Sequence, residues 1–181
     1  MREWTNIQRG MQIRELQKGD LKTRVEWMND PRVYSSMHFD VPILLDNTLK
    51  WFDRIITNDK RSDVVFTIDE TIVAFGGLTS ITDNPRLAEL YIFVDPSSQC
   101  KGVGSMATSL LCDWGFSRLG LHKIYLMTND DNISAIKVYQ KCGFQLEGRH
   151  RQEYVGSDGN CRDRLYFGLL KTEFNHEPSI K

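Results

Sequence analysis

A strand that leads through a polar turn into a glycine-opened helix constrains the fold of this chain more than any other feature. Residues 87–94 are rich in strand-forming side chains, and Asp95-Pro96 ends the run. Gly102 and Gly104 then open a segment whose apolar residues recur at spacings of three and four, which predicts a long amphipathic helix closed near Gly120. Those apolar residues are Val103, Met106, Ala107, Leu110, Leu111 and Trp114.

The glycine turn has the chemistry of an anion site. Glycines let the backbone approach a ligand closely, and the first N–H groups of a helix are unpaired at the positive end of its dipole. The turn therefore predicts a place for a phosphate or pyrophosphate. A plain helix-entry turn is the alternative, because such a pattern arises by chance in about one chain in five to ten of this length.

The segments around this turn predict a mixed α/β (α+β) fold. Before it we expect a strand at 11–16, a helix at 21–29 capped by Asp20, an irregular stretch broken by Pro42, and a helix from Asn47 or Thr48. The strands 64–68, 72–80 and 87–94 form an antiparallel meander. After the turn we expect a strand at 122–128, a helix from 132 to about 141, and a hairpin of 144–155 with 161–170, whose Asp158-Gly159 is a strong turn signal. Residues 11–174 read as one domain, with loose termini at 1–10 and 175–181.

Charge and composition exclude several classes of protein. Lys and Arg total 23 against 24 Asp and Glu, so the strongly basic patch of a nucleic-acid binder is not expected. The apolar runs are too short for a membrane span, and the N-terminus has no signal-peptide pattern. Four scattered cysteines without a C-x-x-C pair predict neither a disulfide framework nor a metal site, and favour the cytoplasm.

A second motif lies about thirty residues beyond the glycines. Asn132-x-x-Ala135-x-x-x-Tyr139-x-x-x-Gly143-Phe144 follows Gln99-x-x-Gly102-x-Gly104 in order and at a fitting distance. With these two motifs the chain resembles the GCN5-related N-acetyltransferase (GNAT) superfamily. The Trp27–Pro31 opening and the residues around Gly156, Asp163 and Phe174 resemble the branch of ribosomal-protein alanine/serine, polyamine and amino-sugar acetyltransferases.

The resemblance implies a helix-flanked, mostly antiparallel sheet that splays between two parallel strands, here 87–94 and 122–128. Acetyl-CoA would bind in that splay as the acetyl donor, with no metal. Backbone groups of Ile92, Phe93 and Val94 would hold the pantetheine, and Asn132 would touch the cofactor. The pyrophosphate would bind amides of the turn that contains Gln99, Cys100, Lys101, Gly102, Val103, Gly104 and Ser105. Cys100 departs from the basic residue often found there, and Asn132 is also a favourable helix N-cap.

Two residues are candidates for proton transfer. The resemblance places Tyr139 near the thioester sulfur, where a phenol that stays protonated at neutral pH can donate to a thiolate. A core aromatic is the alternative for Tyr139. Glu89 shares a strand face with Tyr91 and is the best base. The alternative is a solvated carboxylate, or an ion pair with Arg86 or a neighbour. His38, His122, His150 and His176 are weaker candidates.

The sequence constrains the identity of the acceptor amine least. A protein N-terminal amine is our first expectation, with a polyamine or amino sugar as alternatives, and specificity is expected from residues 30–60 and 149–160. Monomer and homodimer both stay open. Gly102-x-Gly104-x-x-Ala107 also fits a dinucleotide motif with Asp130 as the ribose acid, but too few residues follow for a doubly wound sheet. A non-catalytic acetyl-CoA sensor is the other alternative.

Overall fold

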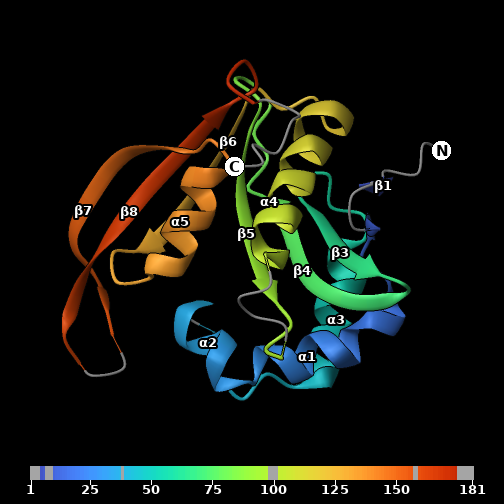
Figure 1. The fold of residues 1–181 in the computed structure, drawn as a ribbon. Helices are drawn as coiled ribbons and strands as arrows, with labels where there is room; N and C mark the ends of the chain where they lie inside the picture. The colour runs from blue at the N-terminus through green and yellow to red at the C-terminus, as the bar shows by residue number, and fades with distance from the viewer. Residues whose placement is uncertain (1–4, 7–9, 38, 98–101, 157–158, 175–181) are drawn as a thin grey trace.

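An eight-stranded sheet organises the molecule (Figure 1). The computed structural model describes residues 5–6, 10–37, 39–97, 102–156 and 159–174. The strands pair in the order β1-β2-β3-β4-β5-β6-β8-β7, and every pairing is antiparallel except that of β5 with β6. They are β1 (Thr5–Asn6), β2 (Met11–Glu15), β3 (Ser62–Ile68), β4 (Thr71–Thr79), β5 (Leu87–Val94), β6 (Lys123–Asn129), β7 (Gln145–Val155) and β8 (Cys161–Leu170). The predicted meander and the mixed, mostly antiparallel sheet are confirmed.

Helices cover both faces of this sheet. They are η1 (Lys18–Asp20), α1 (Leu21–Met28), α2 (Pro31–Met37), α3 (Leu45–Ile55), α4 (Val103–Asp113), the π-helical turn η2 (Trp114–Arg118) and α5 (Ile133–Lys141). Helices α1, α2 and α3 gather at one end of the view in Figure 1, whereas α4 and α5 lie along the strands. Among the described residues, no helix has the length and apolar character to cross a membrane.

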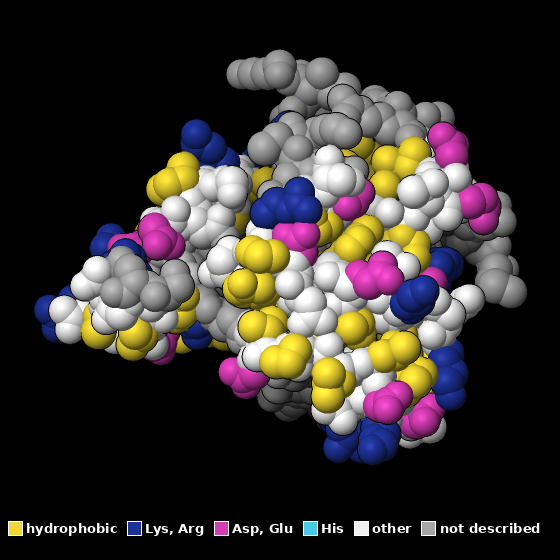
Figure 2. All heavy atoms as spheres, turned by 90° about the horizontal axis from the view of Figure 1, so that it is seen from below, with side chains coloured by type: hydrophobic (Ala, Val, Ile, Leu, Met, Phe, Trp, Pro, Cys, Tyr) yellow, Lys and Arg dark blue, Asp and Glu magenta, His cyan; other side chains and the backbone are white. Residues whose placement is uncertain are grey.

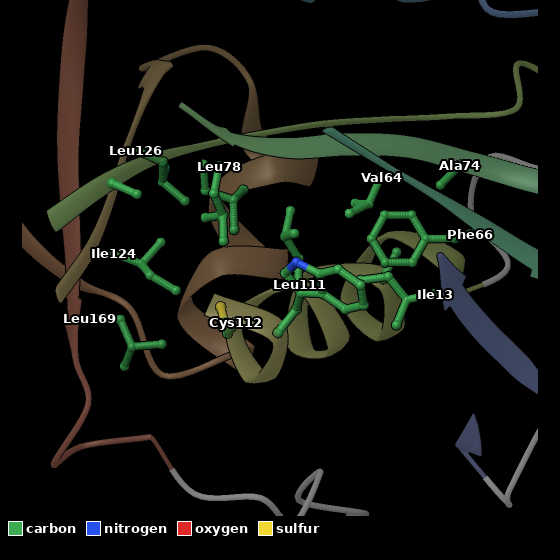
Figure 3. Close-up of a cluster of buried hydrophobic side chains, with 14 of the residues drawn as sticks. Ile13, Val64, Phe66, Ala74, Leu78, Leu111, Cys112, Ile124, Leu126 and Leu169 are labelled. Atoms are coloured by element: carbon green, nitrogen blue, oxygen red, sulfur yellow. The ribbon is translucent and has the colours of Figure 1, made fainter. Parts of the chain in front are cut away.

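Two hydrophobic clusters, one on each face, hold the layers together. Side chains alternate along a strand, so Val64 and Phe66 of β3 pack toward α4 while Val65 packs toward α1–α3. The α4 cluster is the larger, and Figure 3 shows Leu111 and Cys112 packed beneath the strands. This two-sided burial explains why the central strands read as nearly continuous apolar runs.

The parallel strands β5 and β6 pair only at their beginnings. Leu87, Ala88 and Glu89 pair with 123–125, after which the two strands diverge. Beyond that point β5 stays paired with β4 as far as Val94, and β6 stays paired with β8 as far as Asn129. The sheet therefore contains a wedge-shaped gap, as the family resemblance implied.

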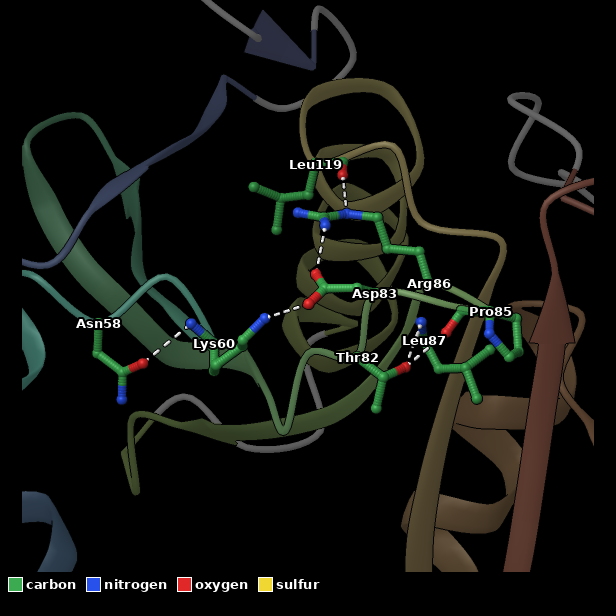
Figure 4. Close-up of polar contacts among 8 residues, drawn as sticks. All are labelled: Asn58, Lys60, Thr82, Asp83, Pro85, Arg86, Leu87 and Leu119. Atoms are coloured by element: carbon green, nitrogen blue, oxygen red, sulfur yellow. Dashed lines mark hydrogen bonds and ion pairs between the residues drawn. The ribbon is translucent and has the colours of Figure 1, made fainter.

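A hydrogen-bonded network around Asp83 and Arg86 lies where this gap begins (Figure 4). Asp83 accepts from Lys60 Nζ at 2.6 Å and from Arg86 Nη1 at 3.2 Å. Arg86 Nε donates to the Leu119 carbonyl at 2.9 Å. The Arg86 carbonyl accepts from His122 N at 2.8 Å. Both parallel strands thus start from one hydrogen-bonded point.

The structure corrects the sequence expectation between residues 20 and 45. Helix α2 occupies part of the stretch expected to be irregular, because proline suits the first position of a helix and Asp30 Oδ1 accepts from Arg32 N at 2.9 Å. Asp20 occupies the N-cap position of α1 as expected, but its side chain does not bond to that helix. The carboxylate instead accepts from Arg14 at 2.7 Å and from Gln17 N at 2.8 Å.

Candidate active site

A cavity of about 620 Å³ opens where β5 and β6 separate. Its floor is Glu89–Ile92 of β5 and Met127–Asn129 of β6, and α1, α2 and α3 supply much of its wall. The lining residues are Arg24, Met28, Ser36, Met37, Phe39, Ile43, Asn47, Thr48, Trp51, Arg61, Thr79, Glu89, Leu90, Tyr91, Ile92, Met127, Thr128, Asn129, Tyr139 and Arg164. Both candidates for proton transfer, Glu89 and Tyr139, are among them.

Glu89 lies at the point where the parallel pairing ends, between Thr79 and Tyr125. Its carboxyl is half-buried, and burial raises its pKa above the usual value, while the nearby Arg164 acts in the opposite direction. The expected alternative, an ion pair with Arg86, is not seen, because Arg86 binds Asp83 and the Leu119 carbonyl instead. Glu89 is therefore a carboxylate that faces the cavity without an ion-pair partner among the described residues.

Tyr139 reaches the cavity from α5. Its ring packs edge-on against Phe144, with ring centroids 5.9 Å apart, and lies 6.2 Å from the ring of Phe167. Burial raises the pKa of its phenol to about 12, so the group keeps its proton at neutral pH. Within the described part of the chain the hydroxyl has no hydrogen-bond partner. The ring is a core aromatic and its polar end is available to a ligand.

The two groups reach the gap from opposite faces of the sheet. Leu90, Ile92 and Val94 pack on the α4 and α5 side, whereas Tyr91 and Phe93 pack on the α1–α3 side. By the alternation of side chains, Glu89 belongs to the α1–α3 side. Tyr139 packs on the other side, with α4 and α5.

The same alternation decides which backbone groups of β5 face the gap. Asp95 N donates to Val73 O of β4 at 3.0 Å, while Arg86 O accepts from His122 N at the start of β6. Odd-numbered residues of β5 therefore turn their N–H and C=O groups toward β4, and even-numbered residues turn theirs toward β6. Of the three residues expected to bind pantetheine, the geometry leaves Ile92 and Val94 facing the gap and turns Phe93 toward β4.

The start of α4 lies beside the end of β5. Gly102 has φ of 78°, a left-handed conformation that favours glycine, and its carbonyl accepts the first helical bond from Met106 N at 3.2 Å. The N–H groups of Val103, Gly104 and Ser105 thus precede the helical ladder, as an anion site requires. Gln99, Cys100 and Lys101 of the same turn lie outside the described residues.

Gly104 leaves room above this helix end. A Cβ there would lie 3.8 Å from Val138 and 3.9 Å from Val94, which is ordinary contact, so packing within the fold does not demand glycine. A glycine beside N–H groups that precede the helical ladder is the arrangement that a pyrophosphate site uses. Residues 11–145 of the chain match the family model described as "Acetyltransferase (GNAT) domain".

The chain belongs to the GNAT acetyltransferase family. The spermidine N(1)-acetyltransferase of Escherichia coli K12 is 33% identical over 123 residues, which cover 68% of this chain and 66% of that enzyme. The L-amino acid N-acetyltransferase AaaT of the same organism is 29% identical over 163 residues, 88% of this chain and 97% of AaaT. The crystal structure of Vibrio cholerae spermidine N-acetyltransferase with CoA and spermine has a TM-score of 0.86 and 25% identity, and covers 90% of this chain and 96% of that one.

These findings confirm the expected family, its fold, its enzyme class and its acetyl-CoA cosubstrate. They also agree with the sheet topology in contradicting the dinucleotide alternative. A GNAT sheet has one short parallel pairing here, not the parallel sheet of a doubly wound fold. Asp130, the expected ribose acid, forms an ion pair with Arg149 at 2.9 Å.

Asn132 has a clear structural role within this GNAT fold. Its Oδ1 accepts from Ala135 N at 3.2 Å and from Ser134 Oγ at 3.1 Å, so it is the N-cap of α5. It lines a second cavity, of about 370 Å³, rather than the main one, and Asn129 lines both. No group of three or more His, Cys, Asp and Glu in the described residues is arranged to hold a metal ion.

The basic residues of the cavity were not predicted from the sequence. Arg24, Arg61 and Arg164 all line it, and Trp51 stacks against the first two, at 4.9 and 5.0 Å. A signal for Arg24 was present, since it lies three residues after Leu21 and four before Met28, on the buried stripe of α1. His122 and His150 do not line the cavity, and His38 and His176 lie outside the described residues.

Proposed function

We propose that this protein transfers the acetyl group of acetyl-CoA directly to a primary amine of a small molecule bound in the cavity, within a ternary complex. The observation that supports this best is the joint position of Glu89 and Tyr139. Both line one cavity at the gap between β5 and β6, and they approach it from opposite faces. An amine from one side and a thioester from the other can then meet between a proton acceptor and a proton donor.

The donor side has the groups that acetyl-CoA needs. The N–H groups of Val103, Gly104 and Ser105 would hold the pyrophosphate, and backbone groups of Ile92 and Val94 would bond to the pantetheine amides. Bound acetyl-CoA supplies the reactive thioester. Because these contacts come from the main chain, their geometry depends on the glycine turn and on the strand divergence.

Glu89 would take the proton that the attacking amine must lose. A primary alkylamine with pKa about 10.4 is almost wholly protonated at neutral pH, so its attack depends on a base. The raised pKa of Glu89 makes it a better proton acceptor than a solvent-exposed glutamate, provided that the pH keeps it ionised. We propose that Glu89 acts through a water molecule.

Tyr139 would stabilise the departing thiolate. A thiol has pKa about 8.5, below the value of about 12 for this phenol, so the proton stays mainly on the phenol while it is donated in a hydrogen bond. The thiolate is then protonated from solvent. This role needs only the hydroxyl, since the ring already has its place against Phe144 and Phe167.

The acceptor is proposed to be a small molecule. The relatives described above are named for spermidine and for L-amino acids, and none of those names supports the protein N-terminal amine that we expected first. A polyamine and an amino acid are therefore the acceptor classes that similarity offers.

Replacement of Tyr139 by Phe tests the proposal. Tyr139→Phe keeps the packing and removes the donor, so we expect kcat to fall about 10²-fold while the Kd for acetyl-CoA stays unchanged. Initial rates and calorimetric titration with acetyl-CoA measure both. Tyr34→Phe, which changes a tyrosine that does not line the cavity, is the control. Full activity in Tyr139→Phe would leave that tyrosine a core aromatic, and acetyl-CoA binding without turnover of any amine would favour a sensor.

A further inference from the structure

Arg24 is a buried cation without a carboxylate partner. Arg24 lies on α1, is 6% exposed and lines the cavity. Its Nη2 donates to the Tyr91 hydroxyl at 3.4 Å, its Nη1 contacts the Met28 sulfur, and its Nε has no partner among the described residues. None of these contacts supplies negative charge.

Aromatic rings hold the Arg24 guanidinium but leave its charge uncompensated. The guanidinium carbon lies 4.9 Å from the centre of the Trp51 ring, 5.3 Å from that of Phe93 and 6.0 Å from that of Tyr91. Such contacts stabilise a cation far less than burial destabilises it. They fix the plane of the guanidinium, which prepares it for two-point binding of an oxyanion.

Two other arginines with partial exposure, Arg61 and Arg14, have acidic partners. Arg61, on the same cavity, binds Asp63 at 2.6 Å, and Arg14 binds Asp20 at 2.7 Å. Asp63 is already occupied, since it also accepts from the Tyr91 hydroxyl at 2.5 Å. Arg24 is thus the buried arginine whose counter-charge the described residues do not provide.

The described residues that line the cavity carry more positive than negative charge. The basic members are Arg24, Arg61 and Arg164, and Glu89 is the acidic member. Asp63, which is not among the lining residues, pairs with Arg61. The charges of Arg24, Arg164 and Glu89 then sum to about one positive. Figure 2 shows that the described outer face at this end mixes basic, acidic and hydrophobic side chains, so the surplus is a feature of the cavity rather than of a basic surface. A polycation would meet repulsion here.

We infer that the acceptor carries an oxyanion group, a carboxylate or a phosphate, in addition to its amine, and that Arg24 binds this group. The inference rests on the proposed acetyl transfer to an amine near Glu89. Glu89 and Tyr91 are two residues apart on one face of β5, a separation of about 7 Å. Because Arg24 donates to the Tyr91 hydroxyl, its guanidinium lies on the Tyr91 side of the cavity, so the amine and the oxyanion occupy neighbouring parts of one site.

Binding without turnover separates this inference from the proposed function. The protein is first saturated with CoA, which occupies the glycine turn, and acetate or inorganic phosphate is then titrated while Tm is followed. We expect one or both anions to raise Tm in the wild type by mass action. Arg24→Gln should abolish the shift, whereas Arg54→Gln, which removes the same charge from the exposed face of α3, should retain it. An equal shift in Arg24→Gln, or no shift in the wild type, overturns the inference.

Matched acceptors then identify the source of the oxyanion. An L-amino acid is compared with its carboxamide, glucosamine 6-phosphate with glucosamine, and spermidine serves as the polycation. In at least one pair the anionic member should have a kcat/KM about ten- to a hundredfold higher, the value of one charge-assisted hydrogen bond. Arg24→Gln should erase that preference, and Arg24→Lys should keep part of it. A higher kcat/KM for spermidine than for every anionic amine contradicts the inference but leaves the proposed acetyl transfer intact.

Discussion

The two faces of the sheet differ in how they make their part of the site. On the α4 and α5 face, the proposed donor contacts are main-chain groups at a helix start and a strand edge. On the α1–α3 face, the cavity is lined by side chains from three short helices, and one of them is a buried charge. In the proposed site, backbone geometry binds the cosubstrate, which leaves the side chains of the other face free to differ with the acceptor.

The largest effect that tests this division is expected at Gly104. Gly104→Val places a branched side chain beside the unpaired N–H groups, so we expect the Kd for acetyl-CoA to rise about 10- to 100-fold, the loss of one charge-assisted hydrogen bond. Calorimetric titration measures it. Gly104→Ala, whose methyl fits at 3.8 Å or more from its neighbours, should lose much less. Unchanged acetyl-CoA affinity in the valine variant would remove the turn from the donor site.

A pair of asparagine substitutions tests whether the two faces act separately. Asn29 joins α1 to the cavity wall, since its amide donates to Ile43 O at 2.8 Å and its carbonyl accepts from Ile43 N at 2.8 Å. Asn29→Ala should cost about 1–3 kcal/mol in urea unfolding and raise KM for the acceptor. Asn132→Ala removes the N-cap of α5 and should cost about 1 kcal/mol. If Asn29→Ala weakens acetyl-CoA binding as much as it raises acceptor KM, the faces are coupled.

The smallest effect is a displacement of the pH profile. Glu89 must be ionised to accept a proton, and Arg164 lowers its pKa. Arg164→Gln should therefore raise that pKa and move the acidic limb of kcat/KM to higher pH, with activity lost on the acid side and retained at high pH. Rates from pH 5 to 9 test this, with Arg162→Gln as a neighbouring control. An acidic limb that stays in place would separate Glu89 from the proton transfer.

The same contrast between faces explains what could be predicted from the sequence. The meander, the long helix after Gly102 and the helix after Asn132 all follow from local periodicity and turn residues, and the structure contains them. Helix α2 was not predicted, because Asp30-Pro31 also fits the end of the preceding helix, although proline suits a helix start. The Arg24 environment could not be predicted, because Trp51 and Phe93 come from segments that only the tertiary fold brings beside α1.

The hydrogen-bonded network at Arg86 holds the start of the gap in place through polar contacts rather than through the side chains that line the cavity. Strands β5 and β6 diverge from a point that hydrogen bonds hold in place. They are paired at Leu87–Glu89, next to this point, and are no longer paired beyond it. In the proposed site, a substitution in α1–α3 would therefore change the acceptor wall of the cavity without moving the point from which β5 and β6 diverge.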